Sequence, residues 1–297
     1  MNPEDKRWLL KARQSLPLNI KVRMTQQRIE QWYTYWGGDI YVAFSGGKDS
    51  TVLAHIARSL YPNIPLVFND TGLEYPEIRN FVKTWSNVTW LKPKMSFREV
   101  LTKYGYPVVS KEVSQKIYQV RTTKSEKLRH KRLHGDNNKY RSGKIPEKWK
   151  FLIDAPFQIS HKCCDALKKR PAAKYTKETD RQPLLGTMTI DSHFRRQTYL
   201  RYGCNAYNLT RPRSMPMAFW TTDDVWEYIK TYNVSYCSVY DTEGIIGTGC
   251  VFCAFGAHRA NPNKFQLLAQ THPKLHAYCM DNLGMREVLE YMNINFT

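Results

Sequence analysis

Short apolar segments alternate along this chain with longer segments in which apolar residues recur every three to four positions. Short apolar runs are typical of buried strands, and the longer periodicity is typical of amphipathic helices. The predicted strands cover residues 40–44, 65–69 and 88–92. The helices predicted to follow them cover residues 50–60, 75–86 and 96–104. Because strands that alternate with helices form βαβ units, we predict an α/β fold with a mostly parallel, twisted sheet and helices on both faces.

The segments that flank or interrupt this alternation have a different character. Residues 3–36 have a helical pattern that ends at two glycines, and residues 254–297 are again helical. Between the two, residues 110–133 predict one long basic helix, followed by a polar loop over residues 135–143. The expected organisation is an N-terminal helical segment (1–37), a central domain (38–260) with a basic insertion (111–150), and a C-terminal helical extension (261–297).

A glycine-rich loop joins the first predicted strand to its helix. The loop consists of Ser45, Gly46, Gly47, Lys48, Asp49 and Ser50. Two glycines let the backbone turn sharply and approach a ligand closely, and a helix start offers unpaired N–H groups at the positive end of its dipole. With the Lys48 charge and the serine hydroxyls added, the loop is predicted to bind pyrophosphate. It is not a Walker A loop, which needs four residues between Gly and Gly-Lys.

Composition and charge narrow the classes of partner. The chain has 297 residues, of which 42% are hydrophobic, and a formal net charge of +19. No apolar run approaches the length of a membrane span, and the first residues have no apolar signal-peptide core. We therefore expect a cytoplasmic protein with reduced thiols and no membrane partner. The positive charge favours nucleic acid, nucleotides or acidic proteins without choosing among them.

Much of that charge lies in the insertion. Residues 111–150 hold 13 Lys and Arg against four Asp and Glu. Lys127, Arg129, Lys131 and Arg132 are clustered within it. A solvated helix face is the usual interpretation of such a cluster. Contact with nucleic acid or with substrate phosphates is the alternative that we predict.

Four cysteines have the pattern of a metal centre. Cys163 and Cys164 are adjacent, and Cys250 and Cys253 form a Cys-x-x-Cys pair after a gap of 86 positions from Cys164. Four thiolates suit Zn²⁺ or a [4Fe–4S] cluster, and the spacing alone leaves both open. The other cysteines are expected to be buried free thiols, with one of them as a reserve ligand; they are Cys204, Cys237 (the reserve) and Cys279.

These motifs together resemble the phosphoadenosine phosphosulfate (PAPS) reductase family within the PP-loop ATP pyrophosphatase superfamily. The Ser-Gly-Gly-x-Asp-Ser loop is similar to the PP-loop, and residues 69–77 are similar to the Asp-Thr-Gly-x-x-x-Pro-Glu motif, with Asp70 and Gly72. A third segment matches the family at Gly186, Ser192 and Arg195, where a solvated face is the alternative for the arginine. Met188 stands where the family usually carries an arginine that holds the phosphate-sulfate end of the substrate.

The resemblance implies a fold, cofactors and roles. It implies an adenine nucleotide alpha hydrolase-like fold, ATP with Mg²⁺ or another adenylyl nucleotide, and catalytic roles for Lys48, Asp49 and Asp70. The Cys-Cys and Cys-x-x-Cys pattern is that of the adenylyl-sulfate reductase branch, which implies a [4Fe–4S] cluster with zinc as the alternative. Nucleotide binding is expected at Ser45 to Ser50, Asp70, Gly72, Gly186, Ser192 and Arg195.

Reductases of the family carry a C-terminal Glu-Cys-Gly-[Leu/Ile]-His motif whose cysteine attacks sulfur, and these residues contain no such motif. Three functions therefore stay open. The first is adenylation of a nucleic acid, DNA or tRNA, with release of pyrophosphate and sulfur transfer from a donor such as a cysteine desulfurase. The second is reduction of PAPS or adenylyl sulfate, and the third is a nucleotide-binding interaction protein. Homodimer formation is also left open.

Overall fold

The computed structural model describes residues 2–135 and 143–297. The chain forms two compact units, and each draws on separated segments of the sequence. The first unit comprises Met1–Asp70, Pro76–Leu91 and Ala172–Tyr240. The second comprises Thr71–Tyr75, Lys92–Pro171 and Asp241–Thr297. No helix among the described residues has the length and apolar character that crossing a membrane requires.

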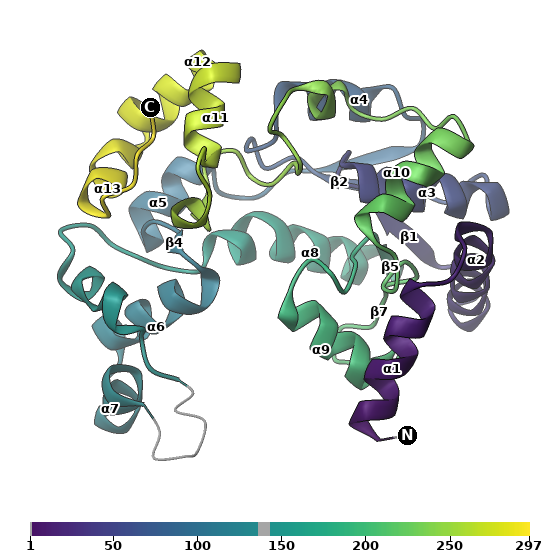
Figure 1. The fold of residues 1–297 in the computed structure, drawn as a ribbon, viewed down its shortest axis with the longest axis horizontal. Coiled ribbons are helices and arrows are strands. Elements are labelled where there is room, and N and C mark those ends of the chain that lie inside the picture. The colour runs from purple at the N-terminus through teal and green to yellow at the C-terminus, as the bar shows by residue number, and fades with distance from the viewer. Residues whose placement is uncertain (1, 136–142) are drawn as a thin grey trace. The chain divides into compact units, whose positions relative to one another are not determined.

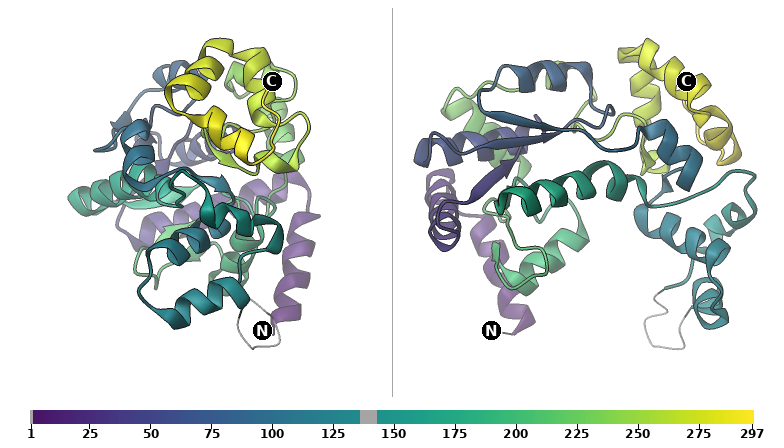
Figure 2. Two further views of the ribbon diagram at one scale, coloured as in Figure 1. Left: turned by 90° about the vertical axis from the view of Figure 1, so that its left-hand side faces the viewer. Right: turned by 180° about the vertical axis from the view of Figure 1, so that it is seen from behind.

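A six-stranded sheet organises the first unit (Figures 1 and 2). In spatial order the strands are β3 (Val88–Leu91), β2 (Leu66–Asn69), β1 (Ile40–Ala43), β5 (Gln182–Leu185), β7 (Arg213–Ser214) and β6 (Asn205–Ala206). Every neighbouring pair is parallel except β6 with β7. The prediction of a mostly parallel sheet is therefore confirmed, with one short antiparallel strand at its edge.

Helices cover both faces of this sheet. They are α1 (Pro3–Gln14), α2 (Leu18–Tyr35), α3 (Lys48–Leu60), α4 (Pro76–Lys83), α8 (Arg170–Thr179), α9 (His193–Tyr202) and α10 (Thr222–Thr231). Side chains alternate between the faces of a strand, so Tyr41 and Phe44 point to opposite sides. The ring of Tyr41 contacts Tyr175 of α8 at 5.1 Å between centroids, and that of Phe44 contacts Trp85 just beyond α4 at 5.1 Å.

Three element boundaries in the first unit differ from the prediction. The region predicted as helical over 3–36 is two helices, because Pro17 interrupts the backbone hydrogen-bond ladder between α1 and α2. The helix expected over 50–60 begins two residues earlier, at Lys48, so that part of the glycine-rich loop is already helical. The helix expected over 75–86 ends at Lys83.

The second unit is mainly helical. It contains α5 (Phe97–Tyr104), β4 (Val108–Val109), α6 (Lys111–Thr122), α7 (Glu126–His134), β8 (Ala254–Phe255), α11 (Lys264–Thr271), α12 (Pro273–Ala277) and α13 (Met285–Tyr291). β4 and β8 pair in parallel as a separate two-stranded sheet. Short 3-10 or π-helical segments join these elements at Glu147–Asp154, Asp165–Lys169, Ala257–Arg259 and Tyr278–Asn282.

The prediction of one continuous basic helix over residues 110–133 is wrong. Two helices, α6 and α7, replace it, with a break at residues 123–125. The Ser125 hydroxyl accepts a hydrogen bond from the Leu128 N–H at 3.3 Å and so caps a new helix. The polar loop predicted over 135–143 falls mostly on residues 136–142, outside the described residues. The three-part division of the chain stays a prediction.

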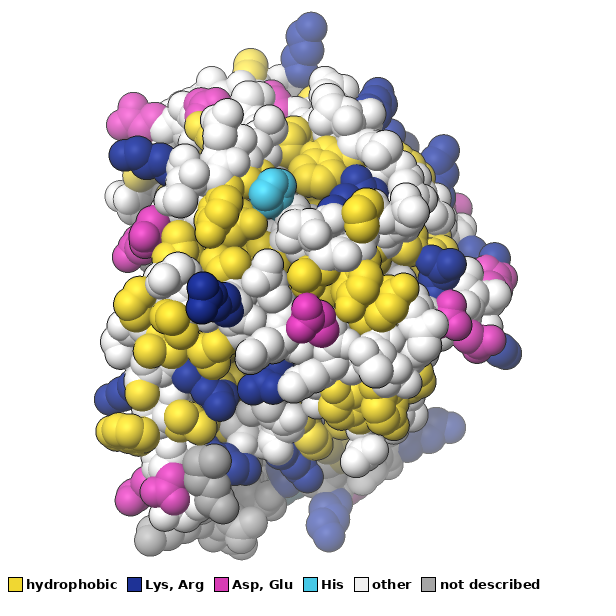
Figure 3. Space-filling model, turned by 90° about the vertical axis from the view of Figure 1, so that its right-hand side faces the viewer, with side chains coloured by type: hydrophobic (Ala, Val, Ile, Leu, Met, Phe, Trp, Pro, Cys, Tyr) yellow, Lys and Arg dark blue, Asp and Glu magenta, His cyan; other side chains and the backbone are white. Residues whose placement is uncertain are grey.

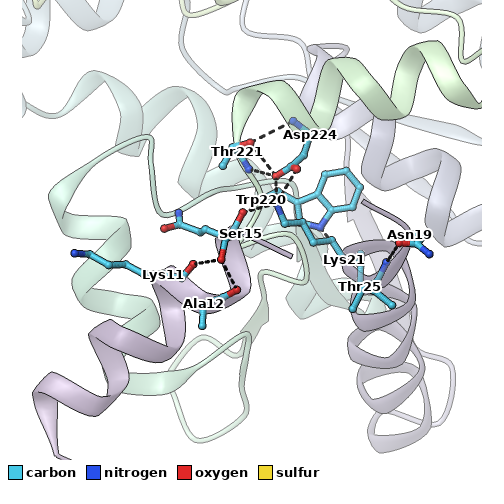
Figure 4. Close-up of polar contacts among 11 residues, drawn as sticks. Lys11, Ala12, Ser15, Asn19, Lys21, Thr25, Trp220, Thr221 and Asp224 are labelled. Carbon is cyan, nitrogen blue, oxygen red and sulfur yellow. Dashed lines mark hydrogen bonds and ion pairs between the residues drawn. The ribbon is translucent and has the colours of Figure 1, made fainter. Parts of the chain in front are cut away.

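A buried ion pair links the N-terminal helices to α10 (Figure 4). The Lys21 ammonium lies 2.7 Å from the Asp224 carboxylate, and both side chains are at least nine-tenths buried. Lys21 also donates to the Gln14 carbonyl at 2.6 Å, while Asp224 accepts from the Thr221 N–H and hydroxyl. Because both charges have additional hydrogen-bond partners, the cost of removing them from water is offset.

Replacing Asp224 by Ala is expected to lower the free energy of unfolding by about 3–5 kcal/mol, because the Lys21 charge stays buried without its counterion. Asp223→Ala is the matched control, since Asp223 is exposed in the first turn of the same helix. Urea unfolding of both variants measures the difference. Equal midpoints for the two variants would show that the pair contributes nothing to stability.

Candidate active site

Two glycines fix the backbone of the PP-loop, which spans residues 45–50. Gly46 has φ +71°, and a Cβ there would lie 2.8 Å from Val82 and 3.0 Å from Ile78, both in α4. At Gly186, just after β5, a Cβ would lie 3.0 Å from the Asp49 carbonyl oxygen. The contact at Gly46 is closer than real Cβ atoms approach, and its positive φ also favours glycine; the contact at Gly186 is tight enough that the α3 backbone would have to shift for a side chain.

A charge pair of a buried lysine and a half-buried aspartate lies at the start of α3. The Lys48 ammonium is 2.6 Å from the Asp49 carboxylate, and the Lys48 side chain is 8% exposed. Burial raises the pKa of Asp49, and the hydrogen bond and charge of Lys48 partly offset this rise. Asp191 raises and Arg195 lowers the same pKa, so both charges lie near the loop. Of the residues predicted to bind nucleotide, Lys48 and Arg195 both act on the charge of a third, Asp49.

Hydroxyl groups hold the rest of the loop in place. The Ser45 and Ser50 hydroxyls are 3.0 Å apart, and the Ser50 hydroxyl donates to the Gly47 carbonyl at 2.9 Å. Gly47, the N-cap of α3, has no side chain to cap the helix. The Lys48 N–H donates to the Tyr240 hydroxyl at 3.1 Å. Sequence reasoning missed Tyr240, because a contact across 192 positions leaves no local signal.

Asp70 and Gly72 have different surroundings. Asp70 follows β2 in the first unit and is 7% exposed, and its carboxylate accepts from the Arg79 guanidinium at 2.9 Å. Gly72 belongs to the second unit and has φ +74°. Mg²⁺ that is bound to phosphates needs only one or two protein carboxylates as further ligands. Asp49 and Asp70 are carboxylates that could supply them.

The segment after β5 brings further polar groups into the first unit. Ser192 is the N-cap of α9, and its hydroxyl accepts from the Arg195 N–H at 3.2 Å. Asp191 forms an ion pair with Arg195 and accepts from the Met188 N–H at 2.9 Å. The Met188 side chain is buried, at 1% exposure, so position 188 supplies no charge for a substrate.

Three buried side-chain oxygens near the carboxyl ends of the strands have no hydrogen-bond partner in the described structure. They are Oγ1 of Thr51, Oδ1 of Asn69 and Oγ1 of Thr187. Thr51 lies in the first turn of α3, Asn69 ends β2, and Thr187 follows Gly186. Buried polar atoms are rarely left unsatisfied, and ligands of parallel sheets bind at this edge. A ligand bound at the carboxyl ends of the strands could therefore supply the missing hydrogen-bond partners of these three oxygens.

The four predicted metal-binding cysteines all belong to the second unit and affect one another. The sulfurs of Cys163 and Cys164 are 3.9 Å apart. The hydrogen bond from Cys163 lowers the pKa of Cys164 to about 6, and nearby lysines add to this effect. The same bond, burial and the thiols of Cys250 and Cys253 raise the pKa of Cys163. Burial raises the pKa of Cys253 to about 11.

Two lysines that sequence reasoning missed lie against Cys250. Burial disfavours the charge of Lys168, but Cys250 and Glu74 outweigh that effect and raise the pKa of Lys168. The Lys264 ammonium donates to the Cys250 carbonyl at 3.0 Å. Positive charge beside thiols favours their thiolate form, which is the form that binds metal.

The four thiols are suitable donors for a cluster, and their electrostatic interactions place them in one neighbourhood. Within residues 2–135 and 143–297, no group of three or more His, Cys, Asp or Glu side chains is arranged to hold a metal ion. The chemistry of the donors thus fits a metal centre, and their side-chain positions would have to adjust to it. The remaining cysteines, Cys204, Cys237 and Cys279, are buried and take part in no disulfide.

The predicted nucleic-acid cluster divides into two kinds of residue. Lys127 and Arg129 are exposed on α7, a helix without buried residues. Arg132 instead donates to the Gln119 side chain of α6 at 2.7 Å and to the Gly143 carbonyl at 3.1 Å. Lys131 is half-buried beside it and lines the same pocket as Lys116. Arg132 therefore helps to hold α7 against α6, whereas Lys127 and Arg129 face solvent.

Comparison with known proteins gives consistent relatives at low identity. The adenosine 5'-phosphosulfate reductase 2 of Bacillus subtilis is 24% identical over 82% of this chain and 87% of its own length. An uncharacterised protein of Methanocaldococcus jannaschii is 27% identical over 72% of this chain, and the match spans 36% of that protein.

Two solved structures are similar at low TM-scores. PAPS reductase from Candida auris has a TM-score of 0.43 and 17% identity, over 81% of this chain and 92% of that one. The U34-tRNA thiolase from Methanococcus maripaludis, solved with its [4Fe–4S] cluster, has a TM-score of 0.39 and 12% identity, over 92% of this chain and 80% of that one.

A match to a family model settles the family. The model of the phosphoadenosine phosphosulfate reductase domain matches residues 39–255, from the start of β1 to the end of β8. That range contains the PP-loop, the segment from Gly186 to Arg195 and both cysteine pairs. This chain therefore belongs to the phosphoadenosine phosphosulfate reductase domain family.

Proposed function

We propose that this protein binds ATP at the PP-loop and adenylates a nucleic-acid substrate, with release of pyrophosphate, as the first half of a sulfur transfer. The observation that carries the proposal is the start of α3. The loop there needs glycine to adopt its backbone conformation, and the N-cap residue, Gly47, has no side chain. The buried Lys48 ammonium belongs to the same helix start. Anionic groups are stabilised at such a helix N-terminus.

The residues of the first unit have defined roles in this reaction. Lys48 and the N-terminal N–H groups of α3 hold the β- and γ-phosphates. A substrate oxygen attacks the α-phosphorus, the bond to the β-phosphate breaks, and pyrophosphate leaves. Mg²⁺, held by the phosphates with Asp49 or Asp70, would offset the charge on the leaving group. Sulfur at the oxidation level of sulfide then displaces AMP.

The four cysteines of the second unit are the proposed holders of the sulfur-transfer centre. We favour an iron–sulfur cluster over zinc, because the adenylyl-sulfate reductase pattern of paired cysteines is present in full. Lys168 and Lys264 beside Cys250 would stabilise the negative charge of four thiolates. When bound, the cluster would supply a site for sulfur or electrons.

Reduction of a sulfonucleotide is the second candidate, supported by relatives named adenosine 5'-phosphosulfate reductases. The buried Met188 speaks against it, because a methionine cannot bind the phosphate-sulfate group that an arginine would hold. Exchange of pyrophosphate into ATP would support the proposed function. Sulfite release from PAPS or adenylyl sulfate with thioredoxin would support reduction, and ATP binding without either activity would support an interaction protein.

Replacing Lys48 by Ala should weaken ATP binding about 10- to 150-fold, because a charge-assisted contact of roughly 1.5–3 kcal/mol is lost. Isothermal titration calorimetry of ATP in the presence of Mg²⁺ measures the change. Lys83→Ala, at an exposed position in the last turn of α4, is the matched control. If both variants bind ATP as tightly as the parent, the PP-loop is not the nucleotide site.

Replacing Cys253 by Ser should remove most of the bound metal, because a hydroxyl is a poor substitute for a thiolate ligand. Iron and zinc quantitation with a visible spectrum, after anaerobic purification, measures the loss and identifies the metal. Cys204→Ser changes a buried thiol of the first unit and should leave the metal content unchanged. Equal metal content in all three proteins would rule out the proposed ligand set.

Changing Lys127, Arg129, Lys131 and Arg132 together to Ala should weaken binding of DNA or tRNA and flatten its dependence on salt, because fewer counterions are released. A variant with only Lys127 and Arg129 changed keeps the contacts of Arg132 to α6 and so separates binding from folding. Fluorescence anisotropy at several salt concentrations is the measurement. Unchanged affinity and salt slope in both variants would leave the cluster a solvated face.

A further inference from the structure

Two helices of the first unit, α1 and α9, carry basic and aromatic side chains. Most of these side chains have no role in the proposed adenylation. The helices pack together through a hydrogen bond of 2.7 Å from the Arg13 guanidinium to the Tyr199 hydroxyl. The two helices contain seven Lys and Arg against two Asp and Glu. We call the solvent-facing part of this pair the α1–α9 surface. The basic residues of the two helices are Lys6, Arg7, Lys11, Arg13, Arg195, Arg196 and Arg201, of which Arg7, Lys11, Arg196 and Arg201 are exposed and the others half-buried.

A pocket of about 300 Å³ lies between the two helices. Lys6, Leu9 and Arg13 line it from α1, where their spacing of three and four positions puts them on one helix face. The end of α9 lines the other side, with Tyr199 and residues 200–203. Such a volume is at the lower end of the range for small-molecule sites, roughly 300–1000 Å³, and it can hold one planar ring with its substituents.

Large aromatic side chains are exposed on the same two helices, and one of them, Tyr202, lines the pocket. Trp8 of α1 is 70% exposed, Phe194 of α9 is 76% exposed, and Tyr202 is 39% exposed. The Arg201 guanidinium lies over the Tyr202 ring at 5.2 Å from its centroid, within the range of a cation–π contact. Figure 3 shows one face of the molecule, on which hydrophobic patches lie among scattered Lys and Arg side chains.

We propose that single-stranded nucleic acid binds along the α1–α9 surface, with one base stacked in the pocket against Tyr202 and others on Phe194 and Trp8. This inference rests on the proposed function, whose substrate class it narrows. Basic side chains that follow the backbone, with rings on which bases stack, are the combination that binds single strands without sequence preference. A duplex hides its base faces and would leave the three rings unused.

α9 also connects this surface to the PP-loop within the first unit. Arg195, in its first turn, affects the pKa of Asp49, whereas Tyr202, in its last turn, lines the pocket. Seven residues of helix span about 10 Å, which is about three stacked nucleotides. A strand that follows α9 from the pocket would therefore bring a nucleotide about three positions away to the phosphate-binding loop.

The test uses a fluorescein-labelled 20-nucleotide oligothymidylate and the full chain, with anisotropy as the readout. The variant Trp8→Ala, Phe194→Ala, Tyr202→Ala should bind about 10- to 100-fold more weakly, because stacking contacts are lost. Its salt slope should stay that of the parent, since no charge has changed. A Lys6→Ala, Arg201→Ala variant should instead flatten the slope.

Two controls separate this result from a general effect. Tyr35→Ala removes an exposed ring of α2, 59% exposed, and should bind as the parent does. Thermal melts should show that all variants are folded, since the changed rings are largely exposed. ATP binding of the triple variant should equal that of the parent, because none of its positions belongs to the PP-loop.

The inference is overturned if the triple variant binds the oligonucleotide like the parent, or if Tyr35→Ala weakens binding as much. Preference for a blunt duplex or for an acidic protein over the single strand would overturn it as well. Loss of binding only in the four-fold α7 variant would move the nucleic-acid site to the second unit. None of these outcomes affects the Lys48→Ala test of ATP binding, so failure of the inference and failure of the proposed function remain distinguishable.

Discussion

The first unit depends on how closely three pieces of backbone approach one another around the start of α3. A Cβ at Gly46 would lie too close to Val82 and Ile78, and a Cβ at Gly186 would press on the Asp49 carbonyl. The strand order brings β5 beside β1, so the chain after β5 must pass the first turn of α3. A side chain at either position would push the helix start away from the sheet and displace the Lys48–Asp49 pair. The proposed phosphate site is therefore a consequence of packing as much as of charge.

Local patterns predicted much of this fold, because the decisive signals were short in range. Three strands and the helices after them followed from apolar periodicity, and the PP-loop from six consecutive residues. The break between α6 and α7 was missed. Ser125, which caps α7, is one of several polar residues in a basic segment, and the helical pattern continues on both sides of it. Tyr240 and Lys264 were missed because they reach their partners from distant segments, and no pattern in the sequence encodes such a contact.

Positive charge serves different purposes in different places. Lys21 is buried and paired, so its charge stabilises the fold. Lys48 is buried beside a carboxylate whose pKa is raised by burial, so it is positioned for an anionic ligand that would share it. The basic side chains of α1 and α9 are mostly exposed, on helices that also carry exposed aromatic rings. Exposed charges contribute little to the stability of a fold in water. A net charge of +19 is thus the sum of structural, ligand-directed and surface charges, and only the structure separates them.

The interleaving of the two units also bears on how the chain is made. β1 pairs with β5 in parallel, but Ile40 and its partner Gln182 are separated by the whole segment that includes α5 to α7. At a synthesis rate of roughly 5–20 residues per second, the intervening stretch of about 140 residues takes about 7–30 s to leave the ribosome. For that time β1 exposes an apolar strand edge with unpaired N–H and C=O groups, the kind of edge that recruits other chains. The nascent polypeptide would therefore rely on chaperones or on slow collapse until translation delivers the missing strand.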